Sequence, residues 1–311
     1  MTDPNHPQPT PYVLDSAERA DLEFDRLRTI EQVYDPGTEE ILTRVDPAPG
    51  SSCLEVGAGA GSIARLLASI AGKTGRVVAT DIDPRFLGNI TYLGVKVTKH
   101  DITADPLPPG SWDLIHARSV LEHLPDPESV LARLIPSLAP HGRLFAEAID
   151  ASAEALAIAA AQAPDRKAAT AFLEFATAVH RLMTIAGAHP ELGSTLPVLL
   201  AAHGLEGITH QRRHPLVPGG KRGFYALSLA RLAPSFQDHG LLDTADGRLS
   251  SLFDDPSMVF PALPIGAAHG HPRDRTATVK TRRVDPAGRA KSAHPSGTTP
   301  QRNNERGGAD E

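Results

Sequence analysis

The sequence predicts an α/β fold, with a sheet of seven mostly parallel strands flanked by helices. An apolar strand from Cys53 to Val56 runs into a turn with alternating glycines, and an amphipathic helix follows the turn. A second strand then ends at Asp81. Strand, glycine turn, helix and strand form the opening unit of a parallel sheet, so the fold is expected to be Rossmann-like. Its ligand should bind at the carboxyl ends of the strands.

Length and composition indicate one large domain. The chain has 311 residues, 41% of them hydrophobic, and a formal net charge of -6. The acidic balance does not favour a nucleic-acid partner, which usually requires a basic surface. Cys53 is the single cysteine, so no internal disulfide can form, and a reducing cytoplasm is expected. No secretory leader and no membrane-length apolar run are evident, so we expect a soluble, cytoplasmic protein without a membrane partner.

The N-terminal segment divides into a polar stretch and a helical preamble. Residues 1–13 are proline-rich and expected to be disordered, and the folded domain is expected over residues 14–270. One helix is predicted from Leu14 to Val33, and a second from about residue 35 to Val45, with Pro36 in its first turn. Tyr12 and Tyr34 either line the active site or serve as ordinary packing residues.

Two kinds of ligand compete for the glycine turn. A dinucleotide site requires G-x-G-x-x-G, which allows a pyrophosphate to rest on the N-terminus of the next helix. This chain has G-x-G-x-G, with Ser62 where the dinucleotide pattern has its third glycine. Glu55 stands two residues before the first glycine, and its carboxylate would repel a pyrophosphate but attract an ammonium group. The third alternative is a glycine turn that binds no ligand.

The composite E-x-G-x-G-x-G followed by an acid resembles motif I of the class I S-adenosylmethionine-dependent methyltransferases. The resemblance spans about residues 14–268 and is specific from Cys53 to Glu147. It implies S-adenosyl-L-methionine as the cofactor and no metal. The motif residues that it assigns to cofactor binding are Glu55, Gly57, Gly59, Gly61 and Asp81.

The same resemblance gives roles to residues at the ends of the next strands, which are expected near 77–79, 95–97, 112–117 and 143–148. Asp81 would hold the ribose hydroxyls, and Ile82 would lie against adenine. Asp101 would accept from the adenine amino group, as suits a carboxylate. Ile102 would cover the other adenine face, and Ala117 and Arg118 would face the methionine portion.

Two residues are candidates for catalysis. His123 follows the fourth strand and could take a proton from a substrate. Its alternative role is local packing with a backbone hydrogen bond. Glu147 ends the fifth strand, where it could orient or deprotonate a substrate, or cap the helix that follows.

The second half of the domain is expected to be largely helical. Residues 151–205 form an insertion that either covers the substrate pocket as a lid or is an ordinary helical crossover. A strand near 208–214, helices at 225–236 and 244–253, and a last strand at 259–267 complete the sheet. Arg212, Arg213, Lys221 and Arg222 form a basic cluster that is either solvated or binds an anionic substrate group. Residues 271–311 are expected to be a disordered tail.

The function implied by the resemblance is SN2 transfer of the sulfonium methyl group to an oxygen, nitrogen or carbon atom of a small molecule. Holding donor and acceptor in line would supply much of the rate acceleration. The alternatives are a methyltransferase acting on a tRNA or protein, and a non-catalytic protein that only binds S-adenosylmethionine. A nicotinamide oxidoreductase is disfavoured by Glu55 and the glycine spacing.

Overall fold

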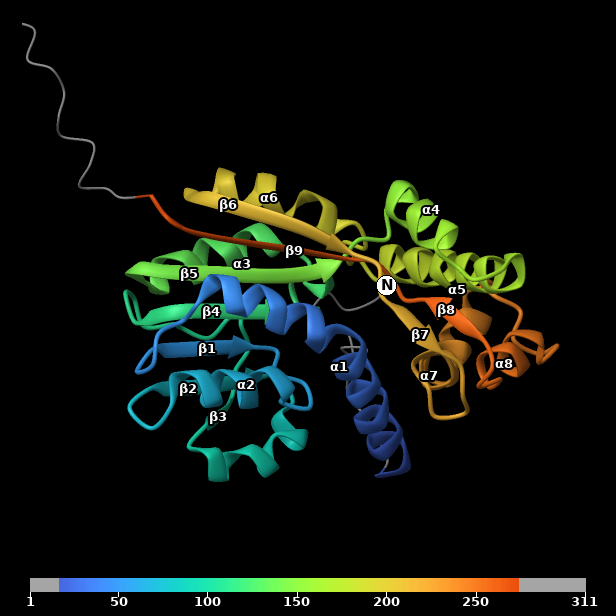
Figure 1. Cartoon of the computed structure of the whole chain (residues 1–311), viewed down its shortest axis with the longest axis horizontal. Coiled ribbons are helices and arrows are strands. Elements are labelled where there is room, and N and C mark those ends of the chain that lie inside the picture. The colour runs from blue at the N-terminus through green and yellow to red at the C-terminus, as the bar shows by residue number, and fades with distance from the viewer. Residues whose placement is uncertain (1–16, 274–311) are drawn as a thin grey trace, which may run out of the picture. The chain divides into compact units, whose positions relative to one another are not determined.

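The computed structural model describes residues 17–273, with side chains from residue 20 onward. A seven-stranded sheet forms its centre, in the order β3-β2-β1-β4-β5-β9-β6 (Figure 1). β1 to β5 are parallel, whereas β9 runs antiparallel to both of its neighbours. The predicted Rossmann-like sheet is therefore confirmed. Its strands are β1 (Ser52–Val56), β2 (Arg76–Asp81), β3 (Lys96–Lys99), β4 (Trp112–Arg118), β5 (Leu138–Ile149), β6 (Leu205–Arg213) and β9 (Ile265–Pro272).

Helices cover both faces of the sheet. α1 (Ala17–Val45) and α2 (Ser62–Ala71) bury apolar residues such as Leu42 and Leu67 against one face. α3 (Pro127–Leu134) and α6 (Leu192–Ala202) cover the other face with residues such as Leu131 and Leu196. Short 3₁₀ helices connect the remaining strands: η1 (Pro84–Phe86), η2 (Gly88–Leu93), η3 (Leu121–His123) and η4 (Ile135–Ser137).

The N-terminal preamble is one helix within the described residues, so the prediction of a helix ending at Val33 and another beginning near Pro36 was wrong. Pro36 lies inside α1. A proline there removes one backbone hydrogen bond and kinks a helix without necessarily ending it. α1 is bent along its length in Figure 1, and it remains helical because both of its halves are packed.

A third apolar cluster lies beyond the carboxyl ends of the strands. It is built by α4 (Ala153–Ala161), α5 (Arg166–Ile185), α7 (Phe224–Asp238) and α8 (Arg248–Phe253), and we call these helices the helical unit. A two-stranded sheet of β7 (Leu216–Pro218) and β8 (Val259–Pro261) belongs to the same unit. Figure 1 places the unit beside the sheet, at the end where β5 and β9 meet it.

The helical unit differs from the predicted insertion at 151–205. α6 packs on β5, β6 and β9, so it covers the sheet and is not part of the unit. Residues 216–261 contribute as much to the unit as residues 153–185 do. The single strand predicted at 259–267 is two strands, because Ala262 to Pro264 lead the chain from β8 into β9. The predictions for residues 1–16, including Tyr12, and for 274–311 lie outside the described residues.

Candidate active site

The glycine turn lies between β1 and α2, at the point where the strand order reverses. Gly57, Gly59 and Gly61 have φ angles of 66°, 57° and 90°. These are left-handed conformations that side chains rarely adopt. A Cβ atom on Gly57 would also lie 2.2 Å from a methyl carbon of Val120. Backbone conformation and close packing therefore both require glycine at position 57.

The N-terminus of α2 is already occupied by a carboxylate of this chain. The Ser62 backbone N–H donates to Glu31 Oε1 at 2.8 Å, and Glu31 reaches this position from α1. Burial raises the pKa of Glu31 despite this hydrogen bond. A pyrophosphate bound at the helix N-terminus would have to displace Glu31. The geometry therefore agrees with the glycine spacing in disfavouring a dinucleotide.

Asp81 lies at the end of β2, beside the glycine turn. Its two carboxylate oxygens accept hydrogen bonds from the backbone N–H groups of Gly59 and Asp83, each at 2.9 Å. Burial raises its pKa. A carboxylate has about four acceptor positions, so two remain for ribose hydroxyls. The neighbouring Ile82 side chain is 47% exposed, an apolar surface beside that carboxylate.

Asp101 and Ile102 follow β3, the neighbour of β2 in the sheet. The Asp101 carboxylate accepts from the backbone N–H of Thr103 at 2.9 Å and from its hydroxyl at 2.6 Å, which lowers the Asp101 pKa. Ile102 packs into the apolar cluster under α3. The roles predicted for this pair at adenine remain predictions, and Ile102 has little exposed surface for contact with a base.

The end of β4 lies against α1. Ala117 is buried, and the Arg118 guanidinium donates to Asp35 Oδ1 at 2.7 Å and to Thr38 Oγ1 at 2.8 Å, both on α1. The next residue, Ser119, has a φ of 53°, which is rare outside glycine. Strained residues of this kind cluster at functional sites. The sequence analysis did not single out Ser119, because its type carries no sign of its conformation.

Glu55, His116 and Glu147 form a buried polar group across three adjacent strands. The His116 ring lies between the two carboxylates, with Nδ1 2.7 Å from Glu55 Oε2 and Nε2 3.3 Å from Glu147 Oε2. Arg213 on β6 donates to the other Glu147 oxygen. Both predicted acids are therefore engaged within the protein. His116 was not among the predicted site residues, although a histidine between buried apolar residues of a strand is a recognisable signal.

His123 ends η3, next to Glu122. Burial and the charge of Arg26 lower the His123 pKa to about 4, so its ring is neutral at physiological pH. Burial raises the Glu122 pKa to about 7, even though Glu122 Oε1 accepts from the Ile149 N–H at 3.0 Å. Glu122 Oε2 is buried and has no hydrogen-bond partner among residues 17–273. The sequence pattern does not predict this buried carboxyl group.

The predicted basic cluster is mostly neutralised within the described residues. Arg213 pairs with Glu147, and Arg222 pairs with Asp25. Arg212 Nε lies 3.0 Å from Asp150 Oδ2, without the alignment of a hydrogen bond, and its Nη1 bonds Glu154 at 3.0 Å. These pairs leave little free positive charge for an anionic group.

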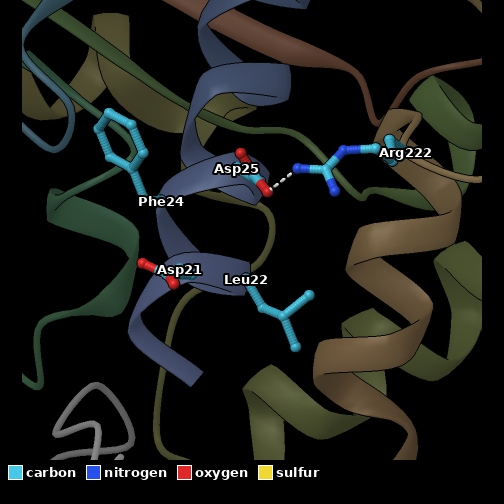
Figure 2. A pocket seen from close by; sticks show the side chains of 5 residues that line it. All are labelled: Asp21, Leu22, Phe24, Asp25 and Arg222. Carbon is cyan, nitrogen blue, oxygen red and sulfur yellow. Dashed lines mark hydrogen bonds and ion pairs between the residues drawn. The ribbon is translucent and has the colours of Figure 1, made fainter. Parts of the chain in front are cut away.

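A pocket of about 380 Å³ opens along the N-terminal half of α1, within the size range of small-molecule sites. Figure 2 shows the ion pair between Asp25 of α1 and Arg222, which precedes α7, at this pocket. Phe24 points to the other side of α1 in this view, and its ring lies 5.4 Å from that of Phe86 in η1. The described residues that line the pocket are Asp21, Leu22, Phe24, Asp25 and Arg222.

The model of the methyltransferase-domain family matches residues 27–210, more than half of the chain. This chain belongs to that family. The class of enzyme predicted for this domain and its cofactor, S-adenosylmethionine, are thereby confirmed. A solved structure, the YcgJ protein from Bacillus subtilis, has a similar fold. It superposes with a TM-score of 0.50 at 14% identity, over 75% of this chain and 97% of the other.

Several relatives at the sequence level are named as methyltransferases. Methyltransferase str2 of Strobilurus tenacellus is 35% identical over 145 residues, covering 45% of this chain and 50% of its own length. Nocamycin O-methyltransferase of Saccharothrix syringae is 33% identical over 133 residues, covering 39% and 48%. Ubiquinone biosynthesis O-methyltransferase of Xanthomonas euvesicatoria is 30% identical over 131 residues, covering 39% and 52%. The chain thus spans about half the length of these relatives.

Residues 17–273 include no helix long and apolar enough to cross a membrane. Over the same residues, no group of three histidine, cysteine or acidic side chains is arranged to hold a metal ion.

Proposed function

We propose that the protein methylates an oxygen atom of a small molecule, with S-adenosylmethionine as the methyl donor. The observation that carries the proposal is the arrangement around the glycine turn. Three left-handed glycines, the Asp81 carboxylate and the exposed Ile82 lie together at the carboxyl ends of β1 and β2. This set fits a ribose and the ring face of a base. Glu31, at the N-terminus of α2, disfavours the pyrophosphate of a dinucleotide.

The residues of the chain would bind and orient the donor and the acceptor. The donor, when bound, supplies a methyl group that its sulfonium makes electrophilic. Asp81 would hold the ribose through hydrogen bonds to its carboxylate. α1 would cover the turn, since Leu27 and Glu31 both reach it. Excluding water and fixing the angle of approach contribute more to such a transfer than a strong base does.

Proton removal from a hydroxyl acceptor would fall to His123. Its pKa of about 4 keeps the ring neutral and ready to accept a proton, although as a weak base. Glu147 suits this role less well, because Arg213, Thr38 and His116 engage its carboxylate. A phenol or enol, which loses its proton readily, matches a weak base better than an aliphatic alcohol does.

Three features support a small molecule over a tRNA or protein. The ion pairs of Arg212, Arg213 and Arg222 leave little free positive charge in the predicted basic cluster. The helical unit packs its apolar cluster beyond the carboxyl ends of the strands, where it would limit the size of an acceptor. Two of the relatives are named as O-methyltransferases of ubiquinone biosynthesis and of nocamycin, which are small molecules.

The test is transfer from methyl-labelled S-adenosylmethionine to separate panels of phenols and enols, amines, bulk tRNA and bulk protein. We expect label in at least one phenol or enol, accompanied by equimolar S-adenosylhomocysteine. The Asp81→Asn variant is the control and should lose most of the transfer. Label only in tRNA or protein would overturn the small-molecule assignment, and donor binding without transfer to any panel would indicate a non-catalytic protein.

A further inference from the structure

A continuous chain of hydrogen bonds connects the two ends of the glycine turn segment, which runs from Glu55 to Ser62. It begins at Glu55, two residues before Gly57, and crosses to His116 and then to Glu147. The Thr38 hydroxyl donates to Glu147 Oε2 at 2.6 Å, which carries the chain from the sheet to α1.

From α1 the chain turns back towards the turn. Arg118 donates to Thr38 Oγ1 at 2.8 Å and to Asp35 Oδ1 at 2.7 Å. The Ser62 hydroxyl, one residue after Gly61, donates to the same Asp35 oxygen at 3.0 Å. Both ends of the turn segment are thereby joined through side chains of β4, β5 and α1.

The middle of this chain is sealed from solvent. Thr38, His116 and Glu147 are each 0% exposed. A buried polar network must be almost fully satisfied, because each unpaired group costs free energy. Both His116 nitrogens face carboxylate oxygens, so the ring donates from both, or one carboxyl carries the proton. A glutamine at this position lacks a ring with polar atoms on two sides, so it cannot keep both contacts in their present geometry.

We propose that this chain positions the glycine turn for the methyl donor, with His116 and Thr38 as positioning residues. The inference rests on the proposed function, since it assigns the turn to S-adenosylmethionine. The chain fixes Glu55 and Arg118, two residues predicted to bind the cofactor, relative to each other. It also holds α1 over the turn, so that the site is formed before the donor binds.

A residue that positions the turn affects the ligand affinity of the folded protein. A residue that only stabilises the fold does not. Thr38→Val removes the hydroxyl with little change of shape, whereas Thr38→Ser keeps the hydroxyl. His116→Gln breaks the same chain two links away. Leu114→Ala is the control, since Leu114 is equally buried on the same face of the same strand.

The experiment is calorimetric titration of the full chain with S-adenosylhomocysteine, at a temperature where melting curves show each variant folded. We expect Thr38→Val and His116→Gln each to raise the Kd on the order of ten-fold, and the double variant to raise it little further, because coupled sites are not additive. Thr38→Ser and Leu114→Ala should bind about as the wild type does.

Folded Thr38→Val that binds with the wild-type Kd would overturn the proposal, and so would a double variant with the product of the two single effects. Thr38→Val keeps the test decisive if His116→Gln does not fold. A wild-type chain that fails to bind the ligand would instead refute the proposed function, and this inference would fall with it.

Discussion

The sheet and the helical unit have cores of different composition. The two clusters on the faces of the sheet are mainly aliphatic, with residues such as Leu54, Leu144 and Ile63. The helical unit is packed around rings, and the Phe175 ring lies 5.2 to 5.9 Å from those of Tyr225, Phe236 and Phe253, nearly perpendicular to each. Such edge-to-face pairs contribute beyond their buried area.

This difference in composition suits two different roles, binding of the methyl donor and binding of the methyl acceptor. The donor site depends on backbone geometry at strand ends, which a regular sheet sets. Under the proposed function, the acceptor side would be shaped by the aromatic packing of the helical unit, which can change without altering the strand ends. The two regions meet at Tyr34, whose hydroxyl donates to the Leu263 carbonyl at 2.8 Å and whose ring lies 6.3 Å from that of Phe224.

The largest expected effect separates the two regions directly. Phe175→Ala should destabilise the protein by about 3–5 kcal/mol, because it leaves a cavity among the rings. The affinity of the folded protein for S-adenosylhomocysteine should stay unchanged. Phe145→Ala is the matched variant, since Phe145 is also fully buried but its ring lies 4.7 Å from that of His116. It should reduce both stability, measured by urea unfolding, and affinity.

If the two phenylalanine variants changed the Kd equally, the division between donor and acceptor regions would be wrong.

The next effect concerns the pH dependence of stability. Burial raises the Glu122 pKa from 4.5 to about 7, so the folded state binds more protons than the unfolded state between these values. Glu122 therefore contributes stability that is present below pH 4.5 and is lost as the pH rises to 7. Glu122→Gln should remove this loss, on the order of 3 kcal/mol above pH 7.

His123 has the opposite effect on the pH dependence of stability. Its pKa falls from 6.5 to about 4, so stability rises with pH across that interval. In the wild type the two neighbours offset each other, and stability should be nearly flat from pH 4.5 to 6.5. Urea unfolding across this range is the measurement. A Glu122→Gln profile that does not rise with pH would contradict the assignment.

The sequence predicted the sheet well because its signals are local. The turn glycines need left-handed conformations, and Asp81 ends a strand, so both can be read from residue type and order. Asp83 precedes Pro84, a local pattern typical of a cap, and its side chain accepts from the Arg85 N–H at the start of η1. The break predicted at Pro36 was wrong, because packing of both halves of α1 outweighed the proline.

The side-chain contacts of the site could not be predicted from the sequence, because the residues that contact each other are far apart in the chain. Thr38 meets Glu147 across 109 positions, and Arg213 meets the same carboxylate across 66. No local pattern predicts such pairs. The pairing of β7 with β8 was missed for the same reason, since the two three-residue strands are separated by two helices.

The smallest expected effect lies at the surface between the two regions. The Asp25–Arg222 pair is partly exposed, and exposed pairs contribute about 0–1 kcal/mol to stability. Arg222→Ala should therefore shift the unfolding midpoint little. On the proposal that the methyl acceptor enters through the pocket in Figure 2, which this pair lines, the variant should change the KM for the acceptor and leave the KM for the donor unchanged. Lys221→Ala, an exposed neighbour, is the control, and an equal change in both variants would exclude a specific role.

We propose that the carboxyl ends of β1 and β2, around Asp81, bind S-adenosylmethionine and not a dinucleotide. Calorimetric titration of the wild type and of Asp81→Asn with S-adenosylmethionine, S-adenosylhomocysteine and NAD(H) tests it most directly. We expect both S-adenosyl compounds to bind the wild type, Asp81→Asn to bind them at least ten-fold more weakly through loss of charge-assisted hydrogen bonds, and NAD(H) not to bind. Binding of NAD(H) alone, or equal affinity of the variant and the wild type, would contradict the claim.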